Sequence, residues 1–195
     1  MRKVYLAGPE VFLPNAMDIG DRKKRICETY GFAGLFPLDK VIEPVGRSSA
    51  EIAIAIYSAN VGLMKKADLL IANMTPFRGP SMDVGTAFEV GFCAAKGLPI
   101  FGYTNFVAKL ADRVSNTTKQ NGLLVDENGL EIENFGFFEN LMIEVPALKN
   151  GGKIFAGPVP HSELFTSLTN FEIAVRHAAD TFGLHSSNQH NRARA

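Results

Sequence analysis

The sequence predicts an α/β protein with a doubly wound fold of flavodoxin or Rossmann type: a single domain with a mainly parallel five-stranded sheet and helices on both faces. Two observations favour this fold class. Short apolar runs alternate along the chain with longer segments of helical spacing, as in proteins built from strand–helix–strand units. The chain of 195 residues is also long enough to bury about 70% of its unfolded surface in one domain.

The strands are predicted from five apolar runs. Each run is short and rich in aliphatic or aromatic residues, and most are bounded by Gly, Pro or Asp. They are residues 3–7, 32–38, 68–72, 99–103 and 153–155.

The helices are predicted from apolar residues that recur at a spacing of three or four. The segments with this spacing are residues 18–30, 48–63, 84–96, 137–148 and 162–182. Ser48 and Glu51 form a capping box for the second helix, Asp83 is placed to cap the third, and Gly97 ends it.

Residues 104–135 fit neither pattern, because Asn, Thr, Asp and Gly are scattered among few periodic apolar positions. We expect a loop-rich insertion there, within one domain that spans residues 1–185. Residues 186–195 are expected to form a disordered tail.

The composition excludes several classes of partner. Lys and Arg together number 20, as do Asp and Glu, so no strong field attracts a nucleic acid polymer or an anionic membrane. Cys27 and Cys93 lie far apart without metal-ligand spacing, which indicates a reduced compartment and no structural zinc. The first apolar run ends at residues 8–9, too early for a signal peptide, and no apolar run is long enough for a membrane span. We expect a cytoplasmic protein with a small-molecule ligand.

Glu89 is the most informative residue for function. From Val84 to Ala95 every residue except Thr86 and Glu89 is apolar or Gly, so this carboxylate is expected to lie against a core. Asp83 lies near the start of the same helix. Two carboxylates in a partly apolar cleft can divide the work of cleaving a glycosidic bond, one as nucleophile and one as proton carrier. Alternatively, Asp83 is only an N-cap and Glu89 only pairs with Arg78 or a lysine.

If the strand order is 2-1-3-4-5, the first and third strands lie side by side. Ligands of such sheets bind beyond the carboxyl ends of the strands, where the order reverses. Tyr5, Gly8 and Glu10 would then face Asn73 and the loop 75–79. Glu89 and Asp83 would enter the same crevice from the third helix.

The sequence resembles the nucleoside 2-deoxyribosyltransferase family. The segments that carry the resemblance occur in the family's order, and the Asp-x-Gly-x-x-x-Glu-x-Gly element is the most specific. They are Val4-Tyr-Leu-Ala-Gly-Pro9 with Phe12, Thr75-Pro-Phe-Arg-Gly79, Asp83-Val-Gly-Thr-Ala-Phe-Glu89-Val-Gly91, and Asn140-Leu-Met142.

The resemblance implies a pentosyltransferase of nucleoside salvage that moves 2-deoxyribose between purine or pyrimidine bases. Glu89 would form a covalent deoxyribosyl intermediate, Asp83 would manage the proton of the base, and Tyr5 would orient Glu89. The residues implied to contact substrate are Gly8, Phe12, Asn73, Arg78, Gly85, Asn140 and Met142. No metal or organic cofactor is implied.

The resemblance also implies a homo-oligomer, because an Asn at the position of Asn140 reaches a neighbouring subunit's site and binds the 5′-hydroxyl. Some members carry Asp where this chain has Asn73, and an amide cannot supply a titrating proton, so the base preference stays open. Arg78 is also compatible with a solvated loop arginine, and Met142 with core packing.

Two other functions remain open at this point. A hydrolase of the same fold would use Glu89 equally but transfer the sugar of a deoxynucleoside or deoxynucleotide to water. A non-catalytic nucleoside-binding module would bind deoxynucleosides without turnover.

Overall fold

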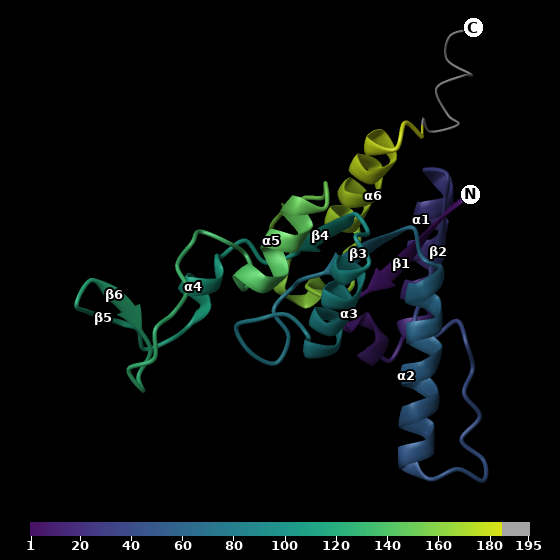
Figure 1. Ribbon diagram of the computed structural model, residues 1–195, viewed down its shortest axis with the longest axis horizontal. Coiled ribbons are helices and arrows are strands. Elements are labelled where there is room, and N and C mark those ends of the chain that lie inside the picture. The colour runs from purple at the N-terminus through teal and green to yellow at the C-terminus, as the bar shows by residue number, and fades with distance from the viewer. Residues whose placement is uncertain (185–195) are drawn as a thin grey trace, which may run out of the picture.

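The computed structural model describes residues 1–184, so the predicted tail 186–195 lies outside the described residues. Five parallel strands form the central sheet in the order β2-β1-β3-β4-β7 (Figure 1), which confirms the predicted fold class. The first and third strands, β1 and β3, are neighbours in this order. The strands are β1 (Arg2–Ala7), β2 (Phe32–Leu35), β3 (Leu69–Asn73), β4 (Ile100–Thr104) and β7 (Ile154–Ala156).

Alternating side chains of the strands supply two separate cores. In β1, Val4 and Leu6 belong to one core, whereas Tyr5 and Ala7 belong to the other. All four are fully buried, as expected for a strand covered on both faces. This alternation directs Tyr5 toward the face on which the predicted nucleophile lies.

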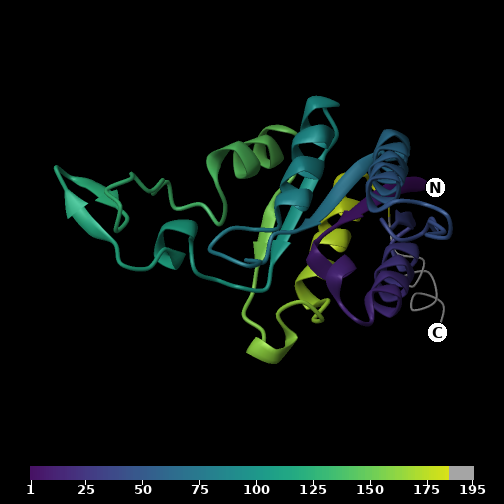
Figure 2. The ribbon, with the colours of Figure 1, turned by 90° about the horizontal axis from the view of Figure 1, so that it is seen from below.

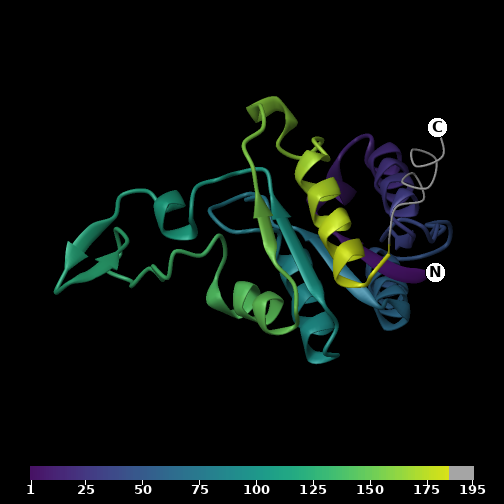
Figure 3. The ribbon, with the colours of Figure 1, turned by 90° about the horizontal axis from the view of Figure 1, so that it is seen from above.

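Helices cover both faces of the sheet (Figures 2 and 3). Helices α1 (Ala16–Thr29) and α6 (Thr169–Thr181) pack on the face of Val4. Helices α2 (Ser49–Lys66), α3 (Val84–Ala95) and α5 (Leu141–Lys149) lie on the face of Tyr5. A short 3-10 helix, η1 (Pro9–Phe12), connects β1 to α1.

Several predicted bounds differ from those in the structure, and a specific cap or turn accompanies the three cases that follow. Strand β2 stops at Leu35, since Asp39 accepts a hydrogen bond from the backbone N–H of Phe36 in a turn. Helix α5 begins only at Leu141, capped by the Asn140 side chain, rather than at residue 137. Helix α6 begins at Thr169 rather than at residue 162, which instead lies in the 3-10 helix η2 (His161–Glu163).

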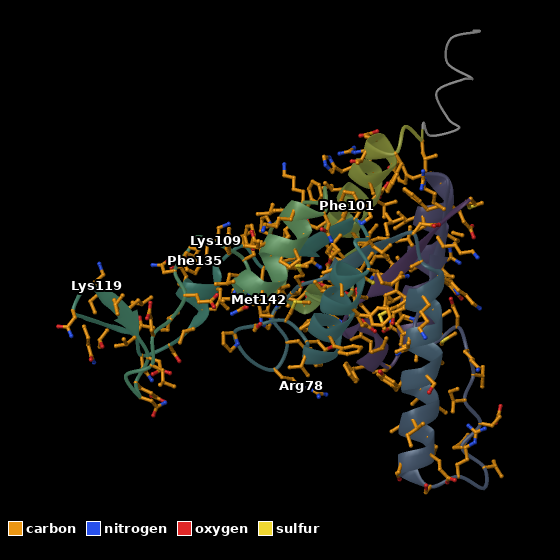
Figure 4. The ribbon with its side chains drawn as sticks, viewed as in Figure 1. Arg78, Phe101, Lys109, Lys119, Phe135 and Met142 are labelled. Atoms are coloured by element: carbon orange, nitrogen blue, oxygen red, sulfur yellow. The ribbon has the colours of Figure 1, made fainter. Side chains whose placement is uncertain are left out.

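The segment 104–135 is more ordered than expected. Thr104 completes β4, and the rest contains a short helix, α4 (Leu110–Arg113), and a hairpin of β5 (Thr118–Gln120) and β6 (Leu123–Val125). Residues 106–139 form an arm that extends well away from the sheet, with Lys119 at its far end (Figures 1 and 4).

The base of the arm is fastened to the loop that precedes α3. Glu139 accepts hydrogen bonds from Ser81 Oγ at 2.5 Å, from the Met82 N–H at 3.1 Å and from Arg113 Nη1 at 2.9 Å. Arg113 Nη1 also donates to the carbonyl of Pro80. The arm and the loop 75–82 are therefore joined by a buried polar junction.

Helix α2 is apolar but poorly covered. Met64 is its only fully buried residue, whereas Ile54 and Tyr57 are 64% and 58% exposed. Part of the helix extends beyond the sheet (Figure 1). Among residues 1–184, no helix has both the length and the hydropathy needed to cross a bilayer.

Candidate active site

Helix α3 positions both predicted carboxylates. Asp83 is its N-cap, and Asp83 Oδ2 accepts hydrogen bonds from the N–H and the hydroxyl of Thr86 at 2.8 and 3.0 Å. Glu89 follows in the second turn. Capping therefore fixes the Asp83 side chain through one oxygen, and its other oxygen has no hydrogen-bond partner within residues 1–184.

Tyr5 of β1 holds the Glu89 side chain. The Tyr5 hydroxyl donates a hydrogen bond of 2.5 Å to Glu89 Oε1. Burial and the adjacent carboxylate raise the pKa of Tyr5 far above its ordinary value, so the hydroxyl remains a donor. The bond orients the carboxylate and uses one of its oxygens, which leaves Oε2 for another partner.

Burial raises the pKa of Glu89 to about 7. The hydrogen bond from Tyr5 opposes this rise, the charges of Asp83 and Glu10 add to it, and Lys23 counteracts it. A carboxyl group with this pKa changes its protonation near neutral pH. Such a perturbed acid in a cleft is typical of a functional site.

The Glu89 side chain lines a cavity of about 280 Å³ that lies between the β1–η1 junction, α2 and the start of α3. Apolar side chains form most of its wall, and a few polar groups converge on one side, as in small-molecule sites. The lining residues are Gly8, Val11, Phe12, Pro37, Leu38, Ile56, Asn60, Asp83, Gly85, Thr86 and Glu89. A larger polar depression of about 470 Å³ near Arg22 and Glu163 is lined by none of the predicted site residues.

Five of the predicted site residues line this cavity. They are Gly8, Phe12, Asp83, Gly85 and Glu89. Tyr5 does not line the cavity itself, but it donates a hydrogen bond to Glu89, which does. The structure thus brings the predicted nucleophile, proton carrier and orienting hydroxyl together.

Asn73, which was expected to contact substrate, is not among the residues that line the cavity. It is buried at the end of β3, where Nδ2 donates to Glu10 Oε1 at 3.0 Å and Oδ1 accepts from the Thr75 N–H at 3.0 Å. Internal partners therefore engage both polar atoms of this amide.

Arg78 is exposed on the loop 75–82 and does not line the cavity itself (Figure 4). Its guanidinium lies 5.2 Å from the ring centre of Phe12 and 4.6 Å from that of Phe77. The two rings stack at 5.4 Å, so Arg78 covers an aromatic pair whose Phe12 member lines the cavity.

Asn140 and Met142 do not line the cavity of their own chain. Asn140 Oδ1 accepts from the Met142 N–H, and its Nδ2 donates to Glu133 Oε1 at 2.8 Å. The Met142 side chain, 69% exposed, lies at the start of α5 near the base of the arm (Figure 4).

The sequence argument missed Asn60, which lines the cavity from α2. Its Oδ1 is buried and has no hydrogen-bond partner within the described part of the chain. An amide in an otherwise apolar helical segment was the available signal, because a buried, unpaired acceptor is costly without a ligand or water. No cluster of three or more His, Cys, Asp or Glu able to hold a metal ion occurs in residues 1–184.

Comparisons with known proteins show which family this sequence matches. The family model described as nucleoside 2-deoxyribosyltransferase matches residues 4–142. An uncharacterized protein of Schizosaccharomyces pombe is 34% identical over 166 residues, which cover 76% of this chain and 78% of that protein.

The solved structure of a 2-deoxyribosyltransferase from Leishmania mexicana has a similar fold. Its TM-score is 0.64 at 24% identity, and the match covers 92% of this chain and 98% of that one. This likeness concerns the fold alone.

Proposed function

The chain belongs to the nucleoside 2-deoxyribosyltransferase family, and we propose that it transfers 2-deoxyribose between purine or pyrimidine bases in cytoplasmic nucleoside salvage. The observation that carries this proposal is the Tyr5–Glu89 hydrogen bond beside Asp83 in the cavity. It gives the oriented nucleophile and the adjacent acid–base group that a two-step displacement at an anomeric carbon requires.

In the first half-reaction, Glu89 Oε2 attacks C1′ of a 2′-deoxynucleoside. The C1′–N bond breaks, its electron pair leaves with the base, and the Asp83 carboxyl group donates a proton to that base. The product is a deoxyribosyl ester of Glu89. A second base then attacks C1′ from the vacated side, Asp83 receives its proton, and Glu89 departs as a carboxylate with net retention of configuration.

The cavity wall suits a deoxynucleoside. Phe12, Leu38 and Ile56 offer apolar surface to the base and sugar, and the Asn60 amide can accept a hydrogen bond from a base N–H. The absence of a 2′-hydroxyl makes the oxocarbenium-like transition state easier to reach. Deoxynucleosides and free bases are therefore the proposed partners, without a nucleic acid polymer.

We also propose a homo-oligomer in which Asn140 and Met142 complete a neighbouring site. Neither residue lines the cavity of its own chain; near the base of the arm, Asn140 is half-buried and Met142 is exposed. The uncovered apolar residues of α2, such as Ile54 and Tyr57, provide surface for a second copy next to Ile56 and Asn60 of the cavity.

The test is to incubate the protein with 2′-deoxyinosine and adenine and to follow the products by liquid chromatography, with inosine as a control donor. We expect 2′-deoxyadenosine from the deoxy donor alone and none from Glu89→Gln. Hypoxanthine release without base exchange would assign a hydrolase instead. Binding without turnover, unchanged in Glu89→Gln, would assign a binding module.

A further inference from the structure

A fully buried ion pair lies behind the cavity. Lys23 Nζ of α1 is 2.5 Å from Glu10 Oε1 of η1, and neither side chain is exposed. The same oxygen accepts hydrogen bonds from Tyr103 at 2.6 Å and from Asn73 at 3.0 Å. One carboxylate therefore ties η1 to α1, β3 and β4.

This carboxylate lies directly against the cavity wall. A Cβ added to Gly8, which lines the cavity, would collide with Glu10 Oε2 and would come within 2.9 Å of Asn73 Cβ. Val11 and Phe12 of the same 3-10 helix also line the cavity. The position of Glu10 thus determines where this wall lies.

Lys23 is enclosed rather than solvated. Its Nζ lies 5.0 Å from the ring centre of Phe171 and 5.4 Å from that of Tyr103. Burying two charges costs free energy that an apolar pair would not, so such pairs are weak evidence for a purely stabilising role. Stability alone is therefore a weak explanation for this pair.

We propose that Glu10 and Lys23 are positioning residues for the reaction: together they anchor the Gly8–Phe12 wall and hold it without leaving a net charge behind Glu89. This inference rests on the proposed function, because it assigns Glu89 as the nucleophile. Either charge alone would anchor the wall less firmly and would also act on the Glu89 carboxyl group.

The opposing effects of Glu10 and Lys23 on Glu89 can be measured among the other charged and titratable groups around it. The groups around Glu89 are Tyr5 of β1, Glu10 of η1, Lys23 of α1, and Asp83 and Cys93 of α3. Glu10 raises the pKa of Glu89 and Lys23 lowers it. Removing the Glu10 charge and removing the Lys23 charge should therefore shift the Glu89 pKa in opposite directions.

The experiment labels glutamate side-chain carboxyl carbons with ¹³C and follows the signal that Glu89→Gln removes during a pH titration. Lys23→Met should raise the Glu89 pKa and Glu10→Gln should lower it, each by about half a unit or more. The double variant should return close to the wild-type value. Lys24→Met is the matched control, because Lys24 pairs with Asp21 and Asp39 on the exposed side of the same helix. Shifts in the same direction, or none, would overturn the proposal.

Kinetics of base exchange supply the second readout. In the double variant, KM for the deoxynucleoside should rise several-fold, because the wall loses its ion pair to α1 while Glu89 keeps its pKa. The double variant leaves no unpaired buried charge, so it can be measured even if a single variant fails to fold. An unchanged KM in the double variant would overturn the proposal. If the wild-type protein exchanges no bases, the proposed function fails, whereas the titration still decides whether the pair balances the charge at Glu89.

Discussion

Replacing Tyr5 with Phe isolates the hydrogen bond on which the proposed nucleophile depends. The change removes one hydroxyl, whose oxygen lies 2.5 Å from Glu89 Oε1, and keeps the buried ring. A hydrogen bond to a charged group contributes about 1.5–3 kcal/mol. Complete loss of this hydrogen bond would raise the Glu89 pKa by about 1–2 units. We use the lower value, because a water molecule can replace part of the hydrogen bond.

The expected loss of activity follows from the ionised fraction of Glu89. Its pKa of about 7 leaves roughly half of the carboxyl groups ionised at pH 7. In Tyr5→Phe the fraction falls to about one tenth, so kcat/KM at pH 7 should fall about five-fold from ionisation alone. At pH 9 most of this deficit should disappear, and the remainder measures lost orientation.

The assay is the pH profile of kcat/KM for base exchange between pH 5 and pH 9. The acid limb should move up by about one unit in Tyr5→Phe. Tyr30→Phe is the matched control, because it removes a hydroxyl that donates to Glu172 at an exposed position. An acid limb that stays at the wild-type position in Tyr5→Phe would refute the assigned role of the hydroxyl.

Three further predictions concern stability and assembly. Glu89→Gln should abolish base exchange, and it should raise the melting temperature at pH 8 but not at pH 4. The pKa of Glu89 is about 7 in the folded protein, above its ordinary value of 4.5. The free energy of unfolding of the wild type therefore falls by up to about 3 kcal/mol as the pH rises from 4.5 to 7, and the variant avoids this loss. Equal melting temperatures at pH 8 would contradict this cost. Gly8→Ala should displace the Glu10 carboxylate and lower both stability and substrate affinity, measured by thermal melting and KM, whereas Gly62→Ala, where a Cβ meets nothing within 4 Å, should have little effect. Ile54→Lys should dissociate the oligomer in light scattering and reduce exchange, and a wild-type monomer with full activity would exclude shared sites.

The fold was predictable because its strands and most of its helices carry local signals. Each buried strand is a short apolar run, and Asp83 and Ser48 mark helix starts that the structure confirms. The start of α6 depends instead on a distant side chain, since Asn105 binds the carbonyls of Leu164 and Ser167 in the turn before it. The β5–β6 hairpin was missed because its strands are short and largely exposed, so no apolar alternation marks them.

The site was predictable where topology alone brings residues together. Tyr5 and Glu89 meet because β1 and α3 share one face of the sheet. Lys23 could not be recognised from sequence, because a lysine in a basic helix is normally solvated, and only the tertiary structure buries it against Glu10. Asn60 was missed because only the apolar spacing of residues 48–63 was used to predict that helix, whereas α2 is mostly exposed and places Asn60 in the cavity wall.

The Tyr5 hydroxyl has a consequence for the lifetime of the covalent intermediate. In the proposed ester, Glu89 Oε1 becomes a carbonyl oxygen that still faces the hydroxyl, and a neutral acceptor binds a donor less strongly than a carboxylate does. The bond therefore weakens as the ester forms and strengthens again as Glu89 leaves. One fixed donor thereby makes the carboxylate a better leaving group, so the sugar does not remain trapped on the protein.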